Sequence, residues 1–411
     1  MSTVRTSLAA GLLATAVVPV WAAPAAADHP APCSVGELPD SERLADTHAE
    51  DNPAFDRMHV DRAQEVATGK GVRVAVIDSG VRAVEGLDVY SGVAVGGVSS
   101  TTLLSGHGTI VAGLIAGPRG VAPDAQVFDV KVFDADGADT AQGERALTSA
   151  GIVAGIEAVI AANRTQQFDV VNISLAVRQP DPRLEAAIAR LVKLPLVVVA
   201  AAGNNEETPE SDDPGFAGTP GSDADVYPAD YPGVVGVSAT PPGDEDPRTY
   251  VVPNKDTDVA APTAGAISVN ASGQVCVIDQ VATSWAAAEV SGILALLSET
   301  YPRETPQQLV ARLQATTEGA GVPRGSDDAP VNPWTGAGVV QAHDALTRQL
   351  DPGRQGRLEP TVAAVRSDAQ APPAPQPVDL LSTPRAVLLW SGLVAGSLLA
   401  LAFMLRPLVR R

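Results

Sequence analysis

The sequence predicts an α/β fold in which helices cover both faces of a mainly parallel sheet. From residue 71 onward, short valine-rich apolar runs alternate with longer segments of helical spacing. Parallel strands are buried on both faces, so they occur as continuous apolar runs without alternation. Of all residues, 45% are hydrophobic and 4% are aromatic, so the core must consist mainly of Ala, Val, Leu and Ile.

The individual elements follow from the same spacing. Apolar runs without a helical period are predicted to be strands, and they cover residues 72–77, 125–133, 170–175 and 196–201. Segments with a helical period or a capping residue are predicted to be helices, and they cover residues 107–116, 143–163, 181–192, 284–300 and 305–313. Asp181 and Thr305 are each followed by proline, the usual arrangement of an N-cap and the first helical residue. The acidic, Pro- and Gly-containing residues 204–232 are predicted to be a surface loop.

Two segments are predicted to direct the chain to a membrane. Residues 1–27 contain Arg5, an apolar run and then alanines, which is typical of a cleaved secretory signal peptide; a retained signal anchor is the alternative. Residues 386–405 carry no charge and would span about 30 Å as a helix, one hydrocarbon core. Arginines follow, and cationic flanks stay on the cytoplasmic side. We expect a single-pass protein of the cell membrane that contacts lipid through 386–405, with its folded domain outside the cytoplasm.

Between these segments, one folded domain with appendages is predicted. Residues 28–59 form an N-terminal extension, residues 60–350 the domain, residues 351–385 a Pro/Ala-rich spacer, and residues 406–411 a cytoplasmic tail. Cys33 and Cys276 are predicted to form a disulfide, because an exported protein meets an oxidising compartment. Two separate thiols are the alternative.

The charge balance excludes one class of partner. The formal net charge is −20. Binding to a phosphate backbone requires a basic surface that releases counterions. Nucleic acid is therefore not expected to be a partner.

Three segments place Asp, His and Ser, in that order, at the ends of predicted elements. Asp78 ends a strand, His107 opens a helix between two glycines, and Ser284 opens another helix. A serine hydroxyl becomes a nucleophile when a histidine takes its proton, and an aspartate holds that histidine in the required tautomer. Singly, each residue is more often a cap than a catalyst, but together they predict a catalytic triad. Asn204, after the last predicted strand before the acidic loop, is predicted to donate to the oxyanion.

These segments resemble the subtilase family of serine proteases. The matching strings are VAVIDSG at 74–80, GHGTIVAG at 106–113, AAGN at 201–204 and ATSWAA at 282–287. The resemblance implies a three-layer α/β/α sandwich with about seven mainly parallel strands and a serine-type endopeptidase without a cofactor. It also implies that Ser174, Leu175 and Ala176 pair with the peptide substrate. Subtilases often bind structural calcium, but no clustered carboxylate loop supports a metal site here.

The order of the segments narrows the resemblance. A signal peptide, a short cysteine-bearing extension, one catalytic domain, a Pro-rich spacer and a C-terminal membrane helix resemble the mycosins, membrane-anchored proteases associated with type VII secretion systems. This implies a peptide or protein substrate and membrane components of such a system as partners. Two alternatives stay open. One is a general surface subtilase without a secretion partner, and the other is a scaffold of a membrane secretion complex with proteolysis secondary or lost.

Four positions depart from the usual family pattern. Ala282 and Ala176 stand where relatives often have Gly, and Ala288 stands where they have Pro. The methyl group of Ala282 would crowd the substrate carbonyl if the backbone there were close-packed or required a positive φ. Glu289 adds a carboxylate near the start of the helix, which would affect His107 if it pointed inward, but it is expected to face solvent. None of the four changes removes a catalytic atom, so activity is expected.

Overall fold

The computed structural model describes residues 33, 52–135, 144–205, 223–318, 332–358 and 382–409. The chain divides into two compact units between Glu359 and Pro360, and each unit is described by itself. The predicted signal peptide, most of the predicted extension, residues 206–222 of the predicted acidic loop and most of the predicted spacer lie outside the described residues.

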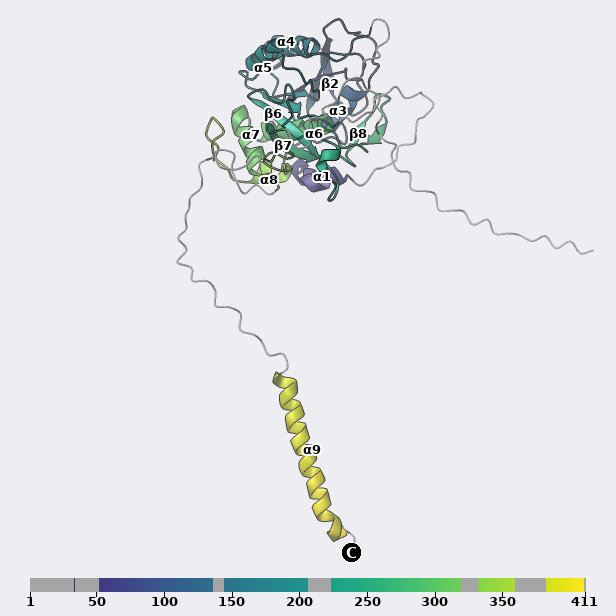
Figure 1. Ribbon diagram of the computed structural model, residues 1–411, viewed down its shortest axis with the longest axis vertical. Helices are drawn as coiled ribbons and strands as arrows, with labels where there is room; N and C mark the ends of the chain where they lie inside the picture. The colour runs from purple at the N-terminus through teal and green to yellow at the C-terminus, as the bar shows by residue number, and fades with distance from the viewer. Residues whose placement is uncertain are drawn as a thin grey trace, which may run out of the picture. The chain divides into compact units, whose positions relative to one another are not determined.

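A seven-stranded parallel sheet forms the centre of the first unit, in the order β2-β3-β1-β4-β5-β6-β7 (Figure 1). Its strands are β1 Arg73–Asp78, β2 Val89–Ala94, β3 Gln126–Lys131, β4 Val170–Ile173, β5 Val197–Ala201, β6 Val234–Thr240 and β7 Thr257–Pro262. A separate antiparallel hairpin consists of β8 Ile267–Val269 and β9 Val275–Val277. The predicted parallel sheet of about seven strands is confirmed.

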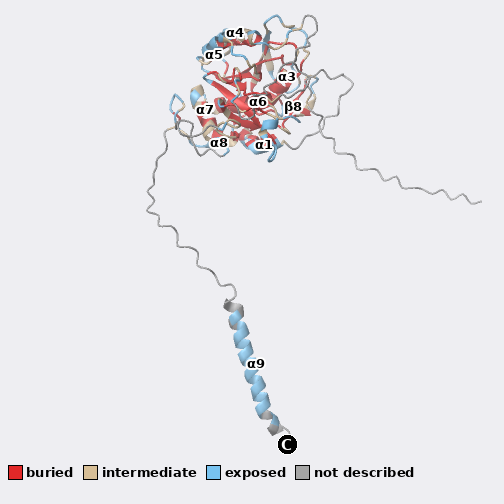
Figure 2. Ribbon diagram, in the orientation of Figure 1, coloured by how far each residue is buried: buried red, intermediate tan, exposed pale blue. Residues whose placement is uncertain are grey.

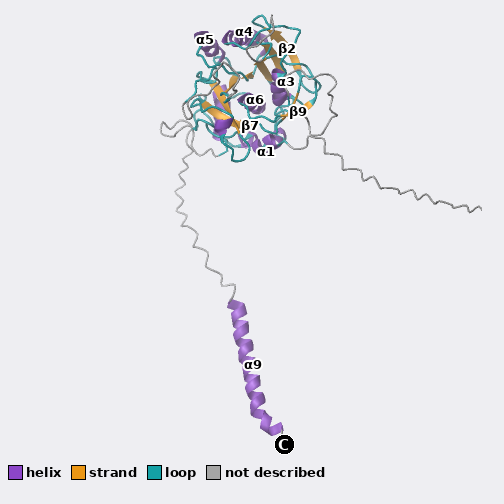
Figure 3. Cartoon of the chain, turned by 45° about the vertical axis from the view of Figure 1, so that its right-hand side comes forward, coloured by secondary structure: helices purple, strands orange, loops and turns teal. Residues whose placement is uncertain are grey.

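Helices cover both faces of the sheet, as Figure 3 shows. One face carries α4 Ser149–Gln166 and α5 Pro182–Leu191. The opposite face carries α1 Pro53–Met58, α2 Val60–Gln64, α3 His107–Ala116, α6 Thr283–Thr300, α7 Pro306–Ala315 and α8 Ala342–Thr347. The predicted three-layer arrangement is therefore confirmed.

The alternation of side chains along β1 explains why the sheet separates two cores. Val74 and Val76 pack into the core shared with α3 and α6, whereas Ala75 and Ile77 pack into the core shared with α4 and α5. Successive strand residues point to opposite faces, so a strand between two helical layers must be apolar at every position. Asp78, the next residue, is polar and is the last residue of β1.

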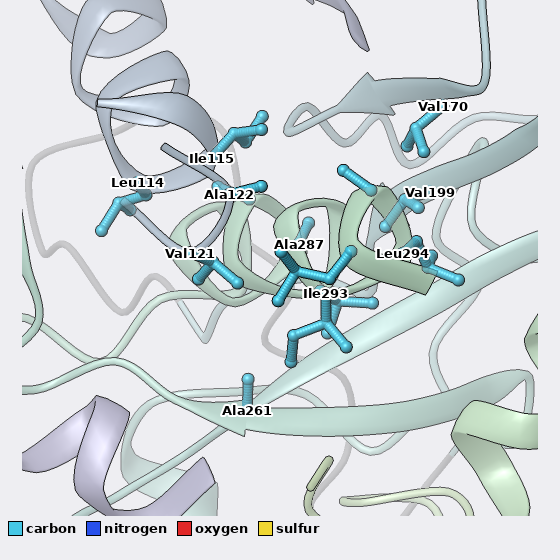
Figure 4. Close-up of a cluster of buried hydrophobic side chains, with 14 of the residues drawn as sticks. Leu114, Ile115, Val121, Ala122, Val170, Val199, Ala261, Ala287, Ile293 and Leu294 are labelled. Carbon is cyan, nitrogen blue, oxygen red and sulfur yellow. The ribbon is translucent and has the colours of Figure 1, made fainter. Parts of the chain in front are cut away.

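Helix α6 is the central element of its layer. Each of its residues from Thr283 to Ser298 is buried, and Figure 2 shows the helix as a red rod inside the unit. Figure 4 shows Ala287, Ile293 and Leu294 of α6 among side chains of α3, β4, β5 and β7. A helix that is apolar on every side must be surrounded by protein. The residues at its start are therefore held by contacts from several elements.

Two capping predictions are confirmed in detail. The Asp181 side chain accepts a hydrogen bond from the backbone N–H of Arg183, and Pro182 is the first residue of α5. Thr305 forms a capping box with Gln308 at the start of α7. Helix α3 begins and ends at the predicted residues.

Helix α1 was not predicted and lies within the segment assigned to the N-terminal extension. Asn52 caps it by accepting a hydrogen bond from the N–H of Phe55, and Pro53 is its first residue. Phe55 and Met58 are buried in the same core as α3 and α6. The end of the extension is therefore part of the folded unit.

The predicted disulfide between Cys33 and Cys276 is present, with the two Cα atoms 4.9 Å apart. Cys33 also donates its backbone N–H to the carbonyl of Val277 on β9. The bridge and this bond fix Cys33 to the β8–β9 hairpin.

The second unit contains helix α9, Ser382–Val409. Its segment Val387–Met404 has a mean hydropathy of 2.1 over 18 residues. At a rise of about 1.5 Å per residue this helix is long enough to cross a hydrocarbon core. Its described side chains are exposed within the unit, as Figure 2 shows in pale blue.

Candidate active site

Asp78 and His107 form the first part of the site. Asp78 ends β1 and is 0% exposed, and its Oδ1 lies 2.8 Å from Nδ1 of His107. The backbone N–H of Ser79 donates to the same oxygen at 2.7 Å. The hydrogen bond to a carboxylate assigns the imidazole proton to Nδ1. Nε2 of His107 therefore carries the lone pair that can accept a proton.

Gly108 explains how α3 approaches β1 closely enough for this hydrogen bond. A Cβ atom on Gly108 would lie 2.6 Å from the carbonyl oxygen of Gly80 and 3.1 Å from Oδ1 of Asp78. The backbone N–H of Gly108 donates to Oγ of Ser79 at 3.0 Å. The glycine after His107 thus makes room for the end of β1.

Ser284 is the second residue of α6 and is 8% exposed. Its carbonyl oxygen accepts a hydrogen bond of 2.7 Å from Oγ of Ser174. The first N–H groups of a helix have no acceptor within the helix, so they and the helix dipole favour a nearby oxyanion. Ala282, the N-cap, has φ −145° and ψ 142°. This is extended backbone, so Ala282 does not carry the strain that a positive φ would impose on alanine.

Asn204 is hydrogen-bonded to Thr283, the first residue of α6. Its Oδ1 accepts hydrogen bonds from the backbone N–H of Thr283 at 2.8 Å and from its Oγ1 at 3.0 Å. Gly203, with φ 102°, donates its own N–H to Oγ1 of Thr283 at 3.2 Å. Because Oδ1 is occupied by two donors, the Nδ2 group is the part of the amide left to donate to a substrate oxygen.

The residues predicted to pair with the substrate follow β4. Ser174 and Leu175 are buried and Ala176 is half-buried. Oγ of Ser174 also contacts the side chain of Asn172, so it connects β4 to α6. Val177, the next residue, forms an antiparallel bridge with Tyr227. Pairing of 174–176 with a peptide stays a prediction.

Trp285 is the principal site residue that sequence reasoning missed. Its ring centroid lies 4.7 Å from that of His107, with an angle of 33° between the planes, and the side chain is buried. Tilted stacking at this distance is favourable and restricts the rotation of both rings. The signal in the sequence was an aromatic residue directly after the candidate nucleophile.

The expectation that Glu289 faces solvent is wrong. Its side chain is 0% exposed, and neither carboxyl oxygen has a hydrogen-bond partner among the described residues. Burial raises the pKa of Glu289 well above its ordinary value. Glu289 cannot face solvent because every residue of α6 from Thr283 to Ser298 is buried.

A buried ion pair fixes the loop before His107. Nζ of Lys131 lies 2.7 Å from Oδ1 of Asp134 and donates to the carbonyl oxygens of Ser99 and Thr102. These contacts satisfy the donors of a buried ammonium group. The end of β3 therefore holds the segment that leads into α3.

Asp129 on β3 is a further carboxyl group near Asp78. Burial, together with the charge of Asp78, raises the pKa of Asp129 to about 7, although a hydrogen bond from the backbone of Val81 opposes this.

In the described part of the chain, no group of three or more His, Cys, Asp or Glu side chains is arranged to hold a metal ion.

Comparison with known protein sequences gives the family. The Subtilase family profile matches residues 69–338. Mycosin-1 of Mycobacterium tuberculosis is 30% identical over 403 residues, which cover 83% of this chain and 87% of that protein. Subtilisin E of Bacillus subtilis is 32% identical over 259 residues, 61% of each chain.

Solved structures agree. The crystal structure of MycP1 from Mycobacterium smegmatis has a TM-score of 0.60 at 25% identity and covers 80% of this chain and 92% of its own. MycP3 protease from the type VII (ESX-3) secretion system has a TM-score of 0.56 at 27% identity. The match covers 81% of this chain and 100% of that chain. The chain therefore belongs to the subtilase family of serine endopeptidases, and within that family it is similar to the mycosins.

Proposed function

We propose that this chain is a membrane-anchored endopeptidase that acts outside the cytoplasm in a type VII secretion system, with Asp78, His107 and Ser284 as its catalytic triad. The observation that supports the triad most directly is the 2.8 Å contact between Nδ1 of His107 and Oδ1 of Asp78. In the neutral imidazole this contact assigns the proton to Nδ1 and leaves the lone pair of Nε2 for the role of general base.

The proposed mechanism assigns one role to each of the four site residues. Oγ of Ser284 attacks the scissile carbonyl carbon while Nε2 of His107 takes its proton, and Asp78 stabilises the imidazolium. The carbonyl π electrons move to oxygen, where Nδ2 of Asn204 and the N–H of Ser284 bind the oxyanion. When the tetrahedral intermediate collapses, His107 protonates the leaving amine. Water then hydrolyses the acyl-enzyme by the same path, and Ser284 recovers its proton.

The substrate is proposed to be an extended peptide that pairs with Ser174, Leu175 and Ala176. The hydrogen bond from Oγ of Ser174 to the carbonyl of Ser284 supports this, because it fixes the distance between that segment and the nucleophile. Main-chain pairing gives affinity for any extended peptide, and side-chain pockets select among them.

The membrane location is proposed from α9 and its flank. The apolar segment Val387–Met404 is followed by Arg406 and, in the sequence, by two further arginines, which favours a cytoplasmic C-terminus. The secretion partner is proposed from relatives whose structures are described as proteases of type VII secretion systems.

Fluorophosphonate labelling of the full chain in detergent tests the enzymatic part. The wild type should be labelled, and Ser284→Ala should not, because only an activated serine reacts with the probe. Ser298→Ala is the matched control, since this serine of the same helix donates to the carbonyl of Leu294 away from the site. Labelling that persists in Ser284→Ala would refute the proposed nucleophile.

The role in secretion is tested in cells. Secretion should fail both on deletion of the chain and in Ser284→Ala. If Ser284→Ala supports secretion and deletion does not, the chain is a scaffold. If neither change affects secretion, it is a general surface protease.

A further inference from the structure

Two buried polar groups lie one helical turn apart behind the candidate catalytic histidine. Nε1 of Trp285 and both carboxyl oxygens of Glu289 have no hydrogen-bond partner among the described residues. Residues four positions apart share one face of a helix, and helical side chains lean toward the N-terminus. Glu289 therefore lies on the same face of α6 as Trp285, whose indole stacks on His107.

The packing of α3 against α6 places Glu289 within an apolar interface. At the start of both helices, Trp285 contacts His107. Seven residues further along α6, Gly292 is so close to the end of α3 that a Cβ atom would lie 2.5 Å from Val121 and 3.3 Å from the carbonyl of Ile115. The helices thus run parallel, and Glu289 lies between these two levels. Figure 4 shows Ile115 and Val121 beside α6.

Few titratable side chains occur on the described elements around α6. Strands β4, β5 and β6 contain none. The others are His107 of α3, Arg119 and Asp124 after α3, Arg73 and Asp78 of β1, Asp258 of β7, Arg312 of α7, His343 and Asp344 of α8, and Glu299 of α6 itself. Burial alone raises the pKa of Glu289, so none of these charges compensates for it.

We propose that Glu289 and Trp285 are positioning residues that make the orientation of His107 depend on pH. While Glu289 carries its proton, Trp285 stays stacked on His107. When base removes that proton, the carboxylate lacks a partner, and the Nε1–H of Trp285 on the same helix face has no acceptor among the described residues. The indole turns to donate to the carboxylate, the stack is lost, and His107 is no longer held for proton transfer. Reprotonation restores the stack.

This proposal rests on the triad proposed above, so the test follows both activity and the indole. The full chain in detergent is compared with Glu289→Gln, which cannot ionise, and with Trp285→Phe, which lacks the N–H donor. The labelling rate is measured against pH and divided by each variant's own maximum. Tryptophan emission is followed in parallel, and the Trp285→Phe spectrum serves as the blank for the other tryptophans.

The wild type should lose relative rate at alkaline pH by about tenfold per pH unit beyond the midpoint, as a single ionisation requires. The Trp285 emission should change with the same midpoint. Glu289→Gln should lack both changes. Trp285→Phe should lack the alkaline loss of rate, because phenylalanine has no N–H that would draw the ring away from His107 toward the carboxylate. Glu289→Met replaces Glu289→Gln if the latter does not fold.

Equal alkaline limbs in the wild type and Glu289→Gln, or a Trp285 emission that does not change with pH, would overturn the proposal. The emission titration is repeated in Ser284→Ala, which has no nucleophile. A change there supports the switch even if the triad assignment fails. Its absence in an otherwise active enzyme refutes the switch alone.

Discussion

Asp78 and Glu289 are both fully buried carboxyl side chains, but they lie in different kinds of backbone. Asp78 ends a strand, where the following N–H of Ser79 is free to donate and His107 adds a second donor. Glu289 lies inside α6, where backbone N–H groups are used within the helix and no side-chain donor among the described residues reaches it. The end of a strand therefore supplies donors to a buried carboxylate, whereas the interior of a helix does not.

The largest effect is expected from Asp78→Asn. The amide would reverse the donor and acceptor roles at Nδ1 of His107, so Nε2 would carry the proton and could not act as base. We expect kcat on a peptide substrate to fall by about 10⁴. Glu289→Gln makes the same chemical change where no hydrogen bond exists, so it is the comparison. A loss of less than tenfold in Asp78→Asn would remove the contrast.

Asn204→Ala should lower kcat by about 10²–10³ with little change in KM, because the oxyanion forms only during reaction. The neighbouring Asn205→Ala is the control. Its Nδ2 donates to the carbonyl of Arg248, so its loss should leave steady-state kinetics nearly unchanged. Equal effects in both variants would indicate a disturbed loop and no loss of an oxyanion donor.

Glu289→Leu should stabilise the protein at alkaline pH. The folded-state pKa is raised, so the unfolded state ionises first, and stability is lost as pH rises above about 4.3. Removing the carboxyl group should raise the free energy of unfolding at pH 8 by about 1–3 kcal/mol, as for an unpaired buried polar group. Urea denaturation of the full chain measures this. A gain of the same size at pH 4 would point to packing and not to charge.

Asp129 is intermediate between Asp78 and Glu289 in the number of donors that reach its carboxyl group, because one backbone N–H, that of Val81, donates to it. Its pKa of about 7 means that stability falls between about pH 4 and pH 7 and then stays level. Asp129→Asn should therefore raise the free energy of unfolding at pH 8 by up to about 4 kcal/mol. At pH 4 the two proteins should unfold at nearly the same urea concentration. A pH-independent difference would contradict the assignment.

The smallest effect is expected from Ala282→Gly. The backbone at Ala282 is extended, so glycine relieves no strain. We expect kcat/KM to change by less than about threefold, which is within the spread of surface substitutions. A large gain would show that the methyl group crowds the substrate.

The sequence predicted what depends on local pattern. Helix α3, the caps at Asp181 and Thr305, and the position of Asp78 at a strand end follow from period and residue type. The same cap pattern was present at Asn52-Pro53 and would have located α1. The triad residues were predicted from their motifs, and the structure brings Asp78 and His107 into contact.

What the sequence did not predict depends on tertiary packing. A single glutamate in an apolar helix normally lies on the side that faces water, but α6 has no such side, because β1, the strands from β4 to β7, and helices α3, α7 and α8 contact it. The stack of Trp285 on His107 joins residues 178 positions apart in the chain, so no local period reports it. Strands β6 and β7 were missed because glycine, serine and threonine interrupt their apolar runs.

The central position of α6 also bears on when the enzyme becomes competent during its synthesis. The ribosome makes all seven strands of the sheet before it makes Ser284. Until α6 emerges, one entire face of the sheet lacks its central helix, and the proposed nucleophile Ser284 has not yet been synthesised. A nascent protease of this design is therefore harmless to its own unfolded chain and to its neighbours until most of the domain has been completed.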